Sequence, residues 1–171
     1  MKKIKVLVLL SLIMMLFGLA ACSSPTSSGS SKSEVAVYKG TSPSKKGATY
    51  DVTITCYSDN TFTIHEYNVK QMLWIKAVTN LDIYSGTYTG DPSKDGTVKI
   101  HATKMADVNA VNKYLDDVGL DTTYIEITNA QGPLIDIPAE GQVEQTYEIV
   151  NGEFELRVPD TTIDKTKVKR Q

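Results

Sequence analysis

The sequence predicts a mainly β protein, an antiparallel up-and-down meander that closes into a small barrel of about eight strands, with one amphipathic helix. Three observations predict it. Apolar and polar residues alternate at period two over many short segments, which is typical of strands with one buried face. Two-residue turns that begin with Asp or Asn precede three of these segments. One stretch instead repeats its apolar residues every three or four positions, which is the spacing of a helix.

The N-terminal segment is predicted to be a targeting signal rather than part of the fold. Three lysines lie among the first five residues, and the apolar stretch Val6–Gly18 follows them. This stretch is too short to span a bilayer as a stable helix, which needs about 20 apolar residues. Leu19-Ala20-Ala21-Cys22 comes directly after it. An ordinary secretory signal with a chance Cys is the alternative interpretation.

The Leu19-Ala20-Ala21-Cys22 run resembles the lipobox of bacterial lipoproteins. The resemblance implies that the Cys22 thiol receives a diacylglyceryl group, that the signal 1–21 is cleaved before Cys22, and that the new N-terminus is acylated, for example with palmitate. Two or three acyl chains would anchor the chain firmly, since each buried CH₂ contributes about 0.8 kcal/mol. We therefore expect a cell-envelope protein on the outer face of the plasma membrane, or on an outer membrane if the host has one.

Residues 22–33 are predicted to be the lipidated Cys and a flexible tether, because Ser23–Ser33 is rich in serine and has no large apolar side chain. Its root-mean-square reach is about 18 Å.

The domain 34–160 is predicted to hold ten candidate strands, of which about eight are expected to be real. Tyr50–Cys56 shows the pattern most clearly, because its apolar side chains share one face. The candidates are Val35–Thr41, Thr49–Tyr57, Thr61–Val69, Leu73–Val78, Leu81–Thr89, Gly96–Ala102, Thr123–Asn129, Leu134–Ile137, Val143–Val150 and Glu153–Val158.

Three turns and one helix complete the predicted elements. Asp59-Asn60, Asp95-Gly96 and Asn151-Gly152 each predict a tight hairpin, because Asn and Gly accept the positive φ of type I′ turns. In Lys104–Val118 the apolar residues lie on one side, and Gly119 follows as a helix C-terminal residue. The stripe comprises Met105, Val108, Val111, Leu115 and Val118. We expect it to cover one end or one open edge of the sheet.

The alternating strands, the Asx-Gly turns and the opening Tyr38-Lys39-Gly40-Thr41 are similar to those of the lipocalin-like barrels of bacterial lipoproteins. A weaker echo of the opening is Tyr84-Ser85-Gly86-Thr87. The resemblance implies a closed barrel, which at this size encloses side chains or one small ligand.

Charge argues against nucleic acid as a partner. Acidic residues number 20 against 18 basic ones, and loss of the three signal lysines would make the chain more acidic. A field of that sign repels nucleic acid and, in general, an anionic lipid surface. The segment 161–171, which carries Lys165, Lys167, Lys169 and Arg170, is predicted to be a solvated basic tail. Contact of this tail with anionic head groups or wall polymers is the alternative.

Few residues carry recognisable chemistry. Cys56 is expected to be buried and unreactive. The alternative is that Cys56 is a nucleophile paired with one of the histidines. His65 and His101 are expected on a strand surface or in the lumen, because they lack the short spacing of metal ligands. Asp91–Gly96 resembles the start of a calcium loop, but Ala102 stands where a Glu is required. A hairpin explains the Asp-Gly pair without metal.

The sequence predicts no enzyme. The Gly-x-Ser-x-Gly and His-Glu-x-x-His motifs and a phosphate-binding glycine loop do not occur. No cofactor and no metal are expected.

Aromatic residues are the candidate ligand-lining set, because a Tyr ring suits half-buried positions that face a ligand. The candidates are Tyr38, Tyr50, Trp74, Tyr84, Tyr88, Tyr124 and Tyr147. Cross-strand packing is the alternative role for them. Met72–Ile75 is expected to be a buried strand or a lip at the barrel mouth. We expect a barrel that binds a small apolar or sugar-like ligand, or alternatively an envelope-surface protein-interaction module with a solid core.

Overall fold

The computed structural model describes residues 32–43, 49–119, 122–158, 163 and 165–171. The predictions for the signal, for Cys22 and for most of the tether lie outside these residues. Among the described residues, no helix has the length and apolar character needed to cross a membrane.

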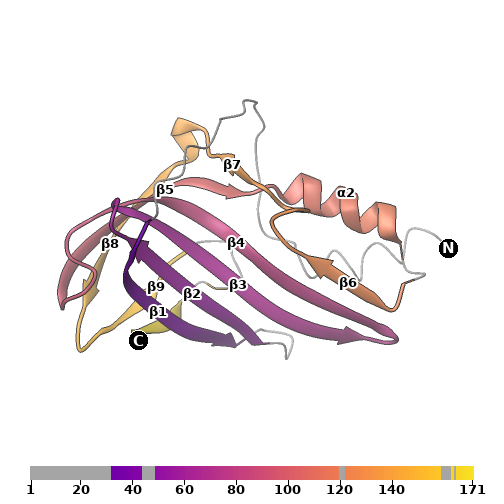
Figure 1. Ribbon diagram of the computed structural model, residues 1–171, viewed down its shortest axis with the longest axis horizontal. Helices are drawn as coiled ribbons and strands as arrows, with labels where there is room; N and C mark the ends of the chain where they lie inside the picture. Colours follow the sequence, from indigo (N-terminus) through magenta and orange to yellow (C-terminus); the bar gives the residue numbers. More distant parts are fainter. Residues whose placement is uncertain (1–31, 44–48, 120–121, 159–162, 164) are drawn as a thin grey trace.

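The described chain is mainly β, as predicted, and its strands form one ten-stranded sheet (Figure 1). The strands are β1 (Glu34–Pro43), β2 (Thr49–Tyr57), β3 (Thr61–Met72), β4 (Ile75–Thr89), β5 (Gly96–Ala106), β6 (Tyr124–Ile127), β7 (Leu134–Asp136), β8 (Val143–Ile149), β9 (Glu153–Leu156) and β10 (Thr166–Arg170). The helix α2 (Val108–Val118) and the short 3₁₀ helix η1 (Ala139–Gly141) accompany them.

The first five strands form the predicted antiparallel meander, each paired with the next in sequence. β8 and β7 pair with consecutive stretches of β5, and β10 lies between β1 and β9. β6 runs parallel to β4, which it reaches after the chain has passed through α2. A parallel neighbour needs such a crossover, so the local pattern of the strand could not have predicted it.

The sheet is not closed into a barrel, contrary to the expected closure. Between β8 and β9, the described residues make the single bridge Val150↔Glu153 at the turn. Beyond it, the Tyr147 hydroxyl lies 3.1 Å from the Arg157 carbonyl oxygen and 3.4 Å from its amide nitrogen. Beyond the bridge, a side-chain contact from β8 links the two strands in place of a backbone ladder, although β9 (Glu153–Leu156) lies within reach of that register.

Two apolar clusters form the core. The larger is enclosed by β1–β5 and β8–β10, with Tyr38, Ile54 and Phe62 among its most buried side chains. The smaller lies beneath α2, where Val111 and Leu115 pack with residues of β4, β5 and β6. The helix therefore covers one part of the sheet, as its stripe predicted.

The helix begins later than predicted, at Val108 instead of Lys104. Asp107 is its N-cap, and its carboxylate accepts hydrogen bonds from the Asn109 and Ala110 amides. Met105 belongs to β5, where it pairs with Ile135. The three- and four-residue spacing continues by chance into the strand, so the cap marks the true start.

Two of the three predicted hairpins are confirmed. The hairpin between β2 and β3 is present, but its turn has three residues, 58–60, of which only Asn60 has a positive φ, 62°. Asn151-Gly152 joins β8 to β9 as a two-residue turn with φ values of 53° and 73°. The turn predicted at Asp95-Gly96 is wrong, because β4 ends at Thr89 and a longer loop precedes β5. The Asp95 carboxylate instead accepts hydrogen bonds from the Asn151 and Gly152 amides at 2.6 and 2.9 Å, and it pairs with Arg170 at 3.1 Å.

The prediction of a strand beginning at Leu73 is wrong. Leu73 and Trp74 form the turn between β3 and β4, and Leu73 has a φ of 53°. The predicted strands Leu73–Val78 and Leu81–Thr89 are parts of one long strand, β4. Ala77 and Val78 are both buried, so the alternation of buried and exposed residues along β4 is interrupted there. In the sequence, this interruption makes one long strand resemble two short ones.

Residues 166–170 form β10 rather than a solvated tail. Thr166 and Val168 are 2% and 0% exposed, while Lys167 and Lys169 between them face solvent. The alternation was present in the sequence, but the density of charge concealed it. Every strand pair and both core clusters lie within residues 32–171, and we refer to this segment as the folded domain.

The two Tyr-x-Gly-Thr segments share a structural cause. A Cβ on Gly40 would lie 2.2 Å from the Lys167 carbonyl oxygen, and one on Gly86 would lie 1.9 Å from the His101 carbonyl oxygen. Real Cβ contacts are never so short. Each glycine therefore lets a neighbouring strand approach, β10 in one case and β5 in the other.

Candidate functional site

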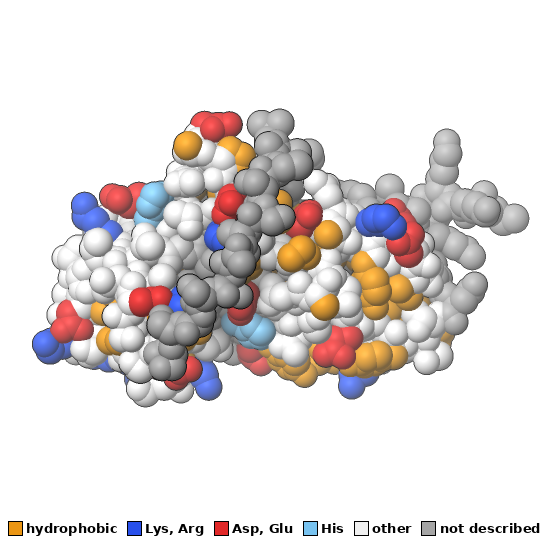
Figure 2. Space-filling view, turned by 45° about the horizontal axis from the view of Figure 1, so that its top comes forward, with side chains coloured by type: hydrophobic (Ala, Val, Ile, Leu, Met, Phe, Trp, Pro, Cys, Tyr) orange, Lys and Arg blue, Asp and Glu red, His pale blue; other side chains and the backbone are white. Residues whose placement is uncertain are grey.

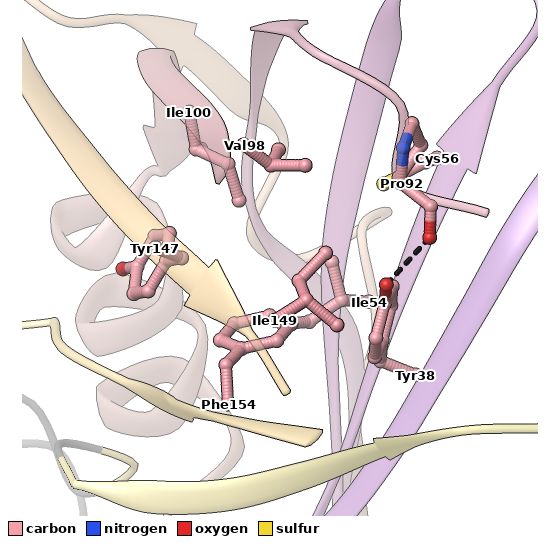
Figure 3. Close-up of a pocket in the computed structure, with 9 residues that line it drawn as sticks. All are labelled: Tyr38, Ile54, Cys56, Pro92, Val98, Ile100, Tyr147, Ile149 and Phe154. Carbon is pink, nitrogen blue, oxygen red and sulfur yellow. Dashed lines mark hydrogen bonds between the residues drawn. The ribbon is translucent and has the colours of Figure 1, made fainter. Parts of the chain in front are cut away.

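The interior of the larger cluster is the place where a lumen ligand would bind, and the described side chains that line it leave little space. Its cavity measures about 10 Å³ (Figure 3). A single water needs about 10–15 Å³ of such volume, so no sugar or lipid fits without repacking. The lining residues are Tyr38, Ile54, Cys56, Pro92, Val98, Ile100, Tyr147, Ile149 and Phe154.

Aromatic rings from three strands occupy this interior. The Phe154 ring lies 5.0 Å from the Tyr38 ring, edge to face, and 4.9 Å from the Tyr147 ring. The Tyr38 hydroxyl donates a 2.5 Å hydrogen bond to the Pro92 carbonyl oxygen, drawn as a dashed line in Figure 3. Burial raises the pKa of Tyr38 above its ordinary value. These contacts are those of a packed core.

The structure does not bring the seven candidate ligand-lining residues together. Tyr38 and Tyr147 line the small cavity. Tyr50 and Tyr88 are also buried, and burial raises the pKa of the partly buried Tyr84 to about 12. The other two candidates, Trp74 and Tyr124, are 61% and 48% exposed on the outside of the domain.

Cys56 is a buried free cysteine, as predicted. It is 2% exposed, and burial raises the pKa of its thiol to about 12. The thiolate, which is the reactive form, is therefore disfavoured at neutral pH.

This burial gives a direct test of reactivity. In the folded domain, where Cys56 is the remaining cysteine, we expect almost no reaction with a disulfide reagent such as DTNB at pH 8, and a stoichiometric reaction after addition of denaturant. The absorbance of the released thiolate measures both. Rapid labelling without denaturant would contradict the burial of Cys56.

The two histidines lie apart from this interior, on strands β3 and β5. The His65 ring contacts Asp82 Oδ1 through Nδ1 at 2.9 Å and Asn80 Oδ1 through Nε2 at 3.0 Å. Both ring nitrogens are thus engaged with β4 side chains that lie opposite on the sheet. These two contacts link the side chains of β3 and β4. Nothing in the sequence indicated Asp82 as a partner of His65.

The Asp91 segment is a hydrogen-bonded turn. Asp91 Oδ1 accepts from the Ser93 amide at 3.0 Å and from the Ser93 hydroxyl at 2.5 Å, and Lys94 lies 2.9 Å from the other oxygen. The hydrogen bond from the Ser93 side chain is the main cause that lowers the pKa of Asp91 to about 2. In the part of the chain that the structure describes, no three His, Cys, Asp or Glu residues form a group that could hold a metal ion.

The outer surface carries a feature that sequence reasoning missed. Leu73 is 84% exposed and Trp74 is 61% exposed at the turn between β3 and β4. Tyr67 and Val69 on β3 and Tyr124 on β6 are each 42–48% exposed. Figure 2 shows hydrophobic side chains gathered on the right-hand part of the molecule. The apolar run Met72–Ile75 was the available signal, but a buried strand explained it equally well.

No family model, no curated protein and no solved structure matches this chain. The geometry described above is therefore what supports a functional conclusion.

Proposed function

We propose that this chain is a lipid-anchored cell-envelope protein whose folded domain is a non-enzymatic interaction module that works through its outer surface. The filled interior, with a cavity of about 10 Å³, carries this proposal. Of the two functions expected from the sequence, the module with a solid core fits this interior better than a small-ligand carrier.

Two features of the chemistry support a non-enzymatic role. The Cys56 thiol is buried, and burial raises its pKa to about 12, which disfavours a nucleophilic role. Each ring nitrogen of His65 faces an oxygen from a neighbouring side chain, and His65 is not among the residues that line the small cavity.

The lipocalin-like architecture remains part of the proposal. Eight strands follow one another around the larger core cluster, in the order β5, β4, β3, β2, β1, β10 and β9, with β8 on the other side of β5. Pairing of β8 with β9 along their length would complete a ring. The bridge Val150↔Glu153 already joins the residue that follows β8 to the first residue of β9.

Native mass spectrometry of the folded domain, purified from its own host, tests the solid core. We expect the native mass to equal the denatured mass, because the cavity has no room for an organic molecule. An added mass that is lost on denaturation would overturn the solid core and favour the lumen-ligand function.

The lipid anchor on Cys22 is tested separately in cells that express the full chain. We expect the wild-type chain to incorporate a labelled fatty acid and to sediment with membranes, and the Cys22→Ala variant to do neither. Cys56→Ala is the matched control, since Cys56 is the other cysteine of the chain, and it should keep the label. Equal labelling of the Cys22→Ala variant would contradict the anchor.

A further inference from the structure

We propose that the turn between β3 and β4 docks on a lipid surface that contains anionic phospholipids, with Leu73 and Trp74 entering the interface. We call residues 70–76 the hairpin tip. The inference rests on the proposed function in one respect, because a lipid on Cys22 would keep the domain within reach of a membrane.

The hairpin tip presents apolar side chains where a soluble turn would present polar ones. Leu73 and Trp74 are 84% and 61% exposed. Leu73 also has a φ of 53°, in the left-handed region that Gly and Asn adopt easily and that bulky residues rarely adopt. An apolar residue retained in an unfavourable backbone conformation, and exposed there, is typical of a functional position.

The chemistry of the hairpin tip fits the boundary between lipid and water. A Trp ring is favoured at the level of the head groups, and Leu is favoured in the acyl region. Tyr67, Val69 and Tyr124 extend the apolar surface along the outer face, since Val69 lies opposite Val78 and Tyr124 lies beside Lys76 in the sheet.

The charge of this region favours an anionic surface over a neutral one. Residues 68–78 contain Lys70 and Lys76 but no Asp or Glu, whereas acidic residues outnumber basic ones in the chain as a whole. Each Lys near a negatively charged membrane adds attraction. The nearest acidic side chain on the adjoining strand is Glu126, which accepts a 3.1 Å hydrogen bond from the Tyr124 hydroxyl. Within residues 68–78 the two lysines therefore favour an anionic surface, in contrast to the acidic balance of the whole chain.

The position of the hairpin tip allows it to reach the membrane together with the tether. The tether enters the domain at Ser33, beside Ser58, next to the turn where β3 begins. The tip lies at the far end of β3, roughly 37 Å away at about 3.4 Å per residue, and at the right-hand end of the long axis in Figure 1. Residues 23–33 span at most roughly 36–40 Å when extended. A domain that lies along the membrane therefore brings both ends to the surface.

Trp74 itself provides the measurement, because it is the one Trp of the chain. The folded domain is mixed with vesicles of phosphatidylcholine alone, or of phosphatidylcholine and phosphatidylglycerol in equal amounts. With the anionic vesicles we expect the Trp74 emission to move to shorter wavelength and to be quenched by brominated acyl chains. We also expect the domain to sediment with these vesicles. With the neutral vesicles we expect weaker binding.

Variants separate the two contributions. The L73S/W74S double variant should lower the partition coefficient, measured by sedimentation, by about tenfold or more. The K70Q/K76Q double variant should abolish the preference for phosphatidylglycerol and the sensitivity to salt. Val150→Ser is the matched control, since Val150 is 62% exposed in the turn between β8 and β9, and it should bind as the wild type does.

Three results would overturn the inference. If the domain unfolds cooperatively on heating but its Trp74 emission is the same with and without either kind of vesicle, it does not dock on lipid. An equal loss of binding in Val150→Ser would show that the hairpin tip is not the site. Cross-linking from position 74 in cells to a protein rather than to lipid would assign the tip to a protein partner. The vesicle measurements use the folded domain, which lacks Cys22, so they do not depend on lipidation. A wild-type chain that incorporates no fatty acid would contradict the anchor and would leave the vesicle measurements unaffected.

Discussion

Deletion of residues 165–171 is expected to abolish the cooperative thermal unfolding of the folded domain. These residues include β10, which lies between β1 and β9 and is the ladder partner of β9. The deletion removes the buried Thr166 and Val168 and also frees two strand edges. Natural domains are stable by about 5–15 kcal/mol, and the loss of an interior strand exceeds that margin. Circular dichroism during heating and limited proteolysis at 25 °C measure the outcome.

Two point variants make the deletion interpretable. Val168→Ala should lower the free energy of unfolding by about 2–3 kcal/mol, because its side chain is fully buried. The K167Q/K169Q double variant should change it by less than about 1 kcal/mol, since both side chains face solvent and the Lys169–Glu153 pair is a surface ion pair. A truncated domain that melts like the full one would show that β10 is dispensable.

Gly86→Ala and Gly40→Ala are expected to destabilise the folded domain by about 3 kcal/mol each, at the upper end of the range for overpacked sites. The new Cβ would lie 1.9 Å from a carbonyl oxygen of β5 in the first case and 2.2 Å from one of β10 in the second. Neither oxygen belongs to a side chain that can rotate away, so the strands must separate. Urea denaturation gives the change in the free energy of unfolding.

Gly141→Ala is the control for this pair. Its Cβ would meet the Ile137 Cγ2 atom at 3.3 Å, and that side chain can adjust. We expect a change below about 1 kcal/mol there. If Gly86→Ala cost no more than Gly141→Ala, the close approach of β4 and β5 would not be what requires glycine.

Local patterns predicted the meander well because its strands pair with neighbours in sequence. β2 was predicted with the bounds that it has in the structure, and α2 was predicted with its true end but with a start at Lys104 instead of Val108. Elements defined by distant contacts were missed or misplaced. β10 depends on β1 for its partner, β6 depends on a crossover through α2, and closure depends on whether β8 and β9 pair beyond the bridge Val150↔Glu153.

The candidate site was harder to predict than the fold. Alternation places Tyr38 and Tyr147 on the inner face, but it does not say whether the space between them is empty or filled by Phe154. Trp74 was chosen for its aromatic ring as a ligand-lining residue, in a buried strand or in a lip at the barrel mouth, whereas it lies exposed at the turn between β3 and β4. Whether an apolar run is a strand or a turn depends on where its neighbours end, which periodicity does not report.

The pairing of β1 with β10 sets the order of events during biosynthesis. Tyr38 faces Arg170, so the first strand of the sheet acquires its second neighbour only after almost all of the described chain has been made. A contact of such long range is slow to form, because the intervening loop must close before the contact stabilises anything. The sheet therefore cannot be completed until β10 has been synthesised. During that interval the backbone groups at the free edge of β1 are accessible to chaperones.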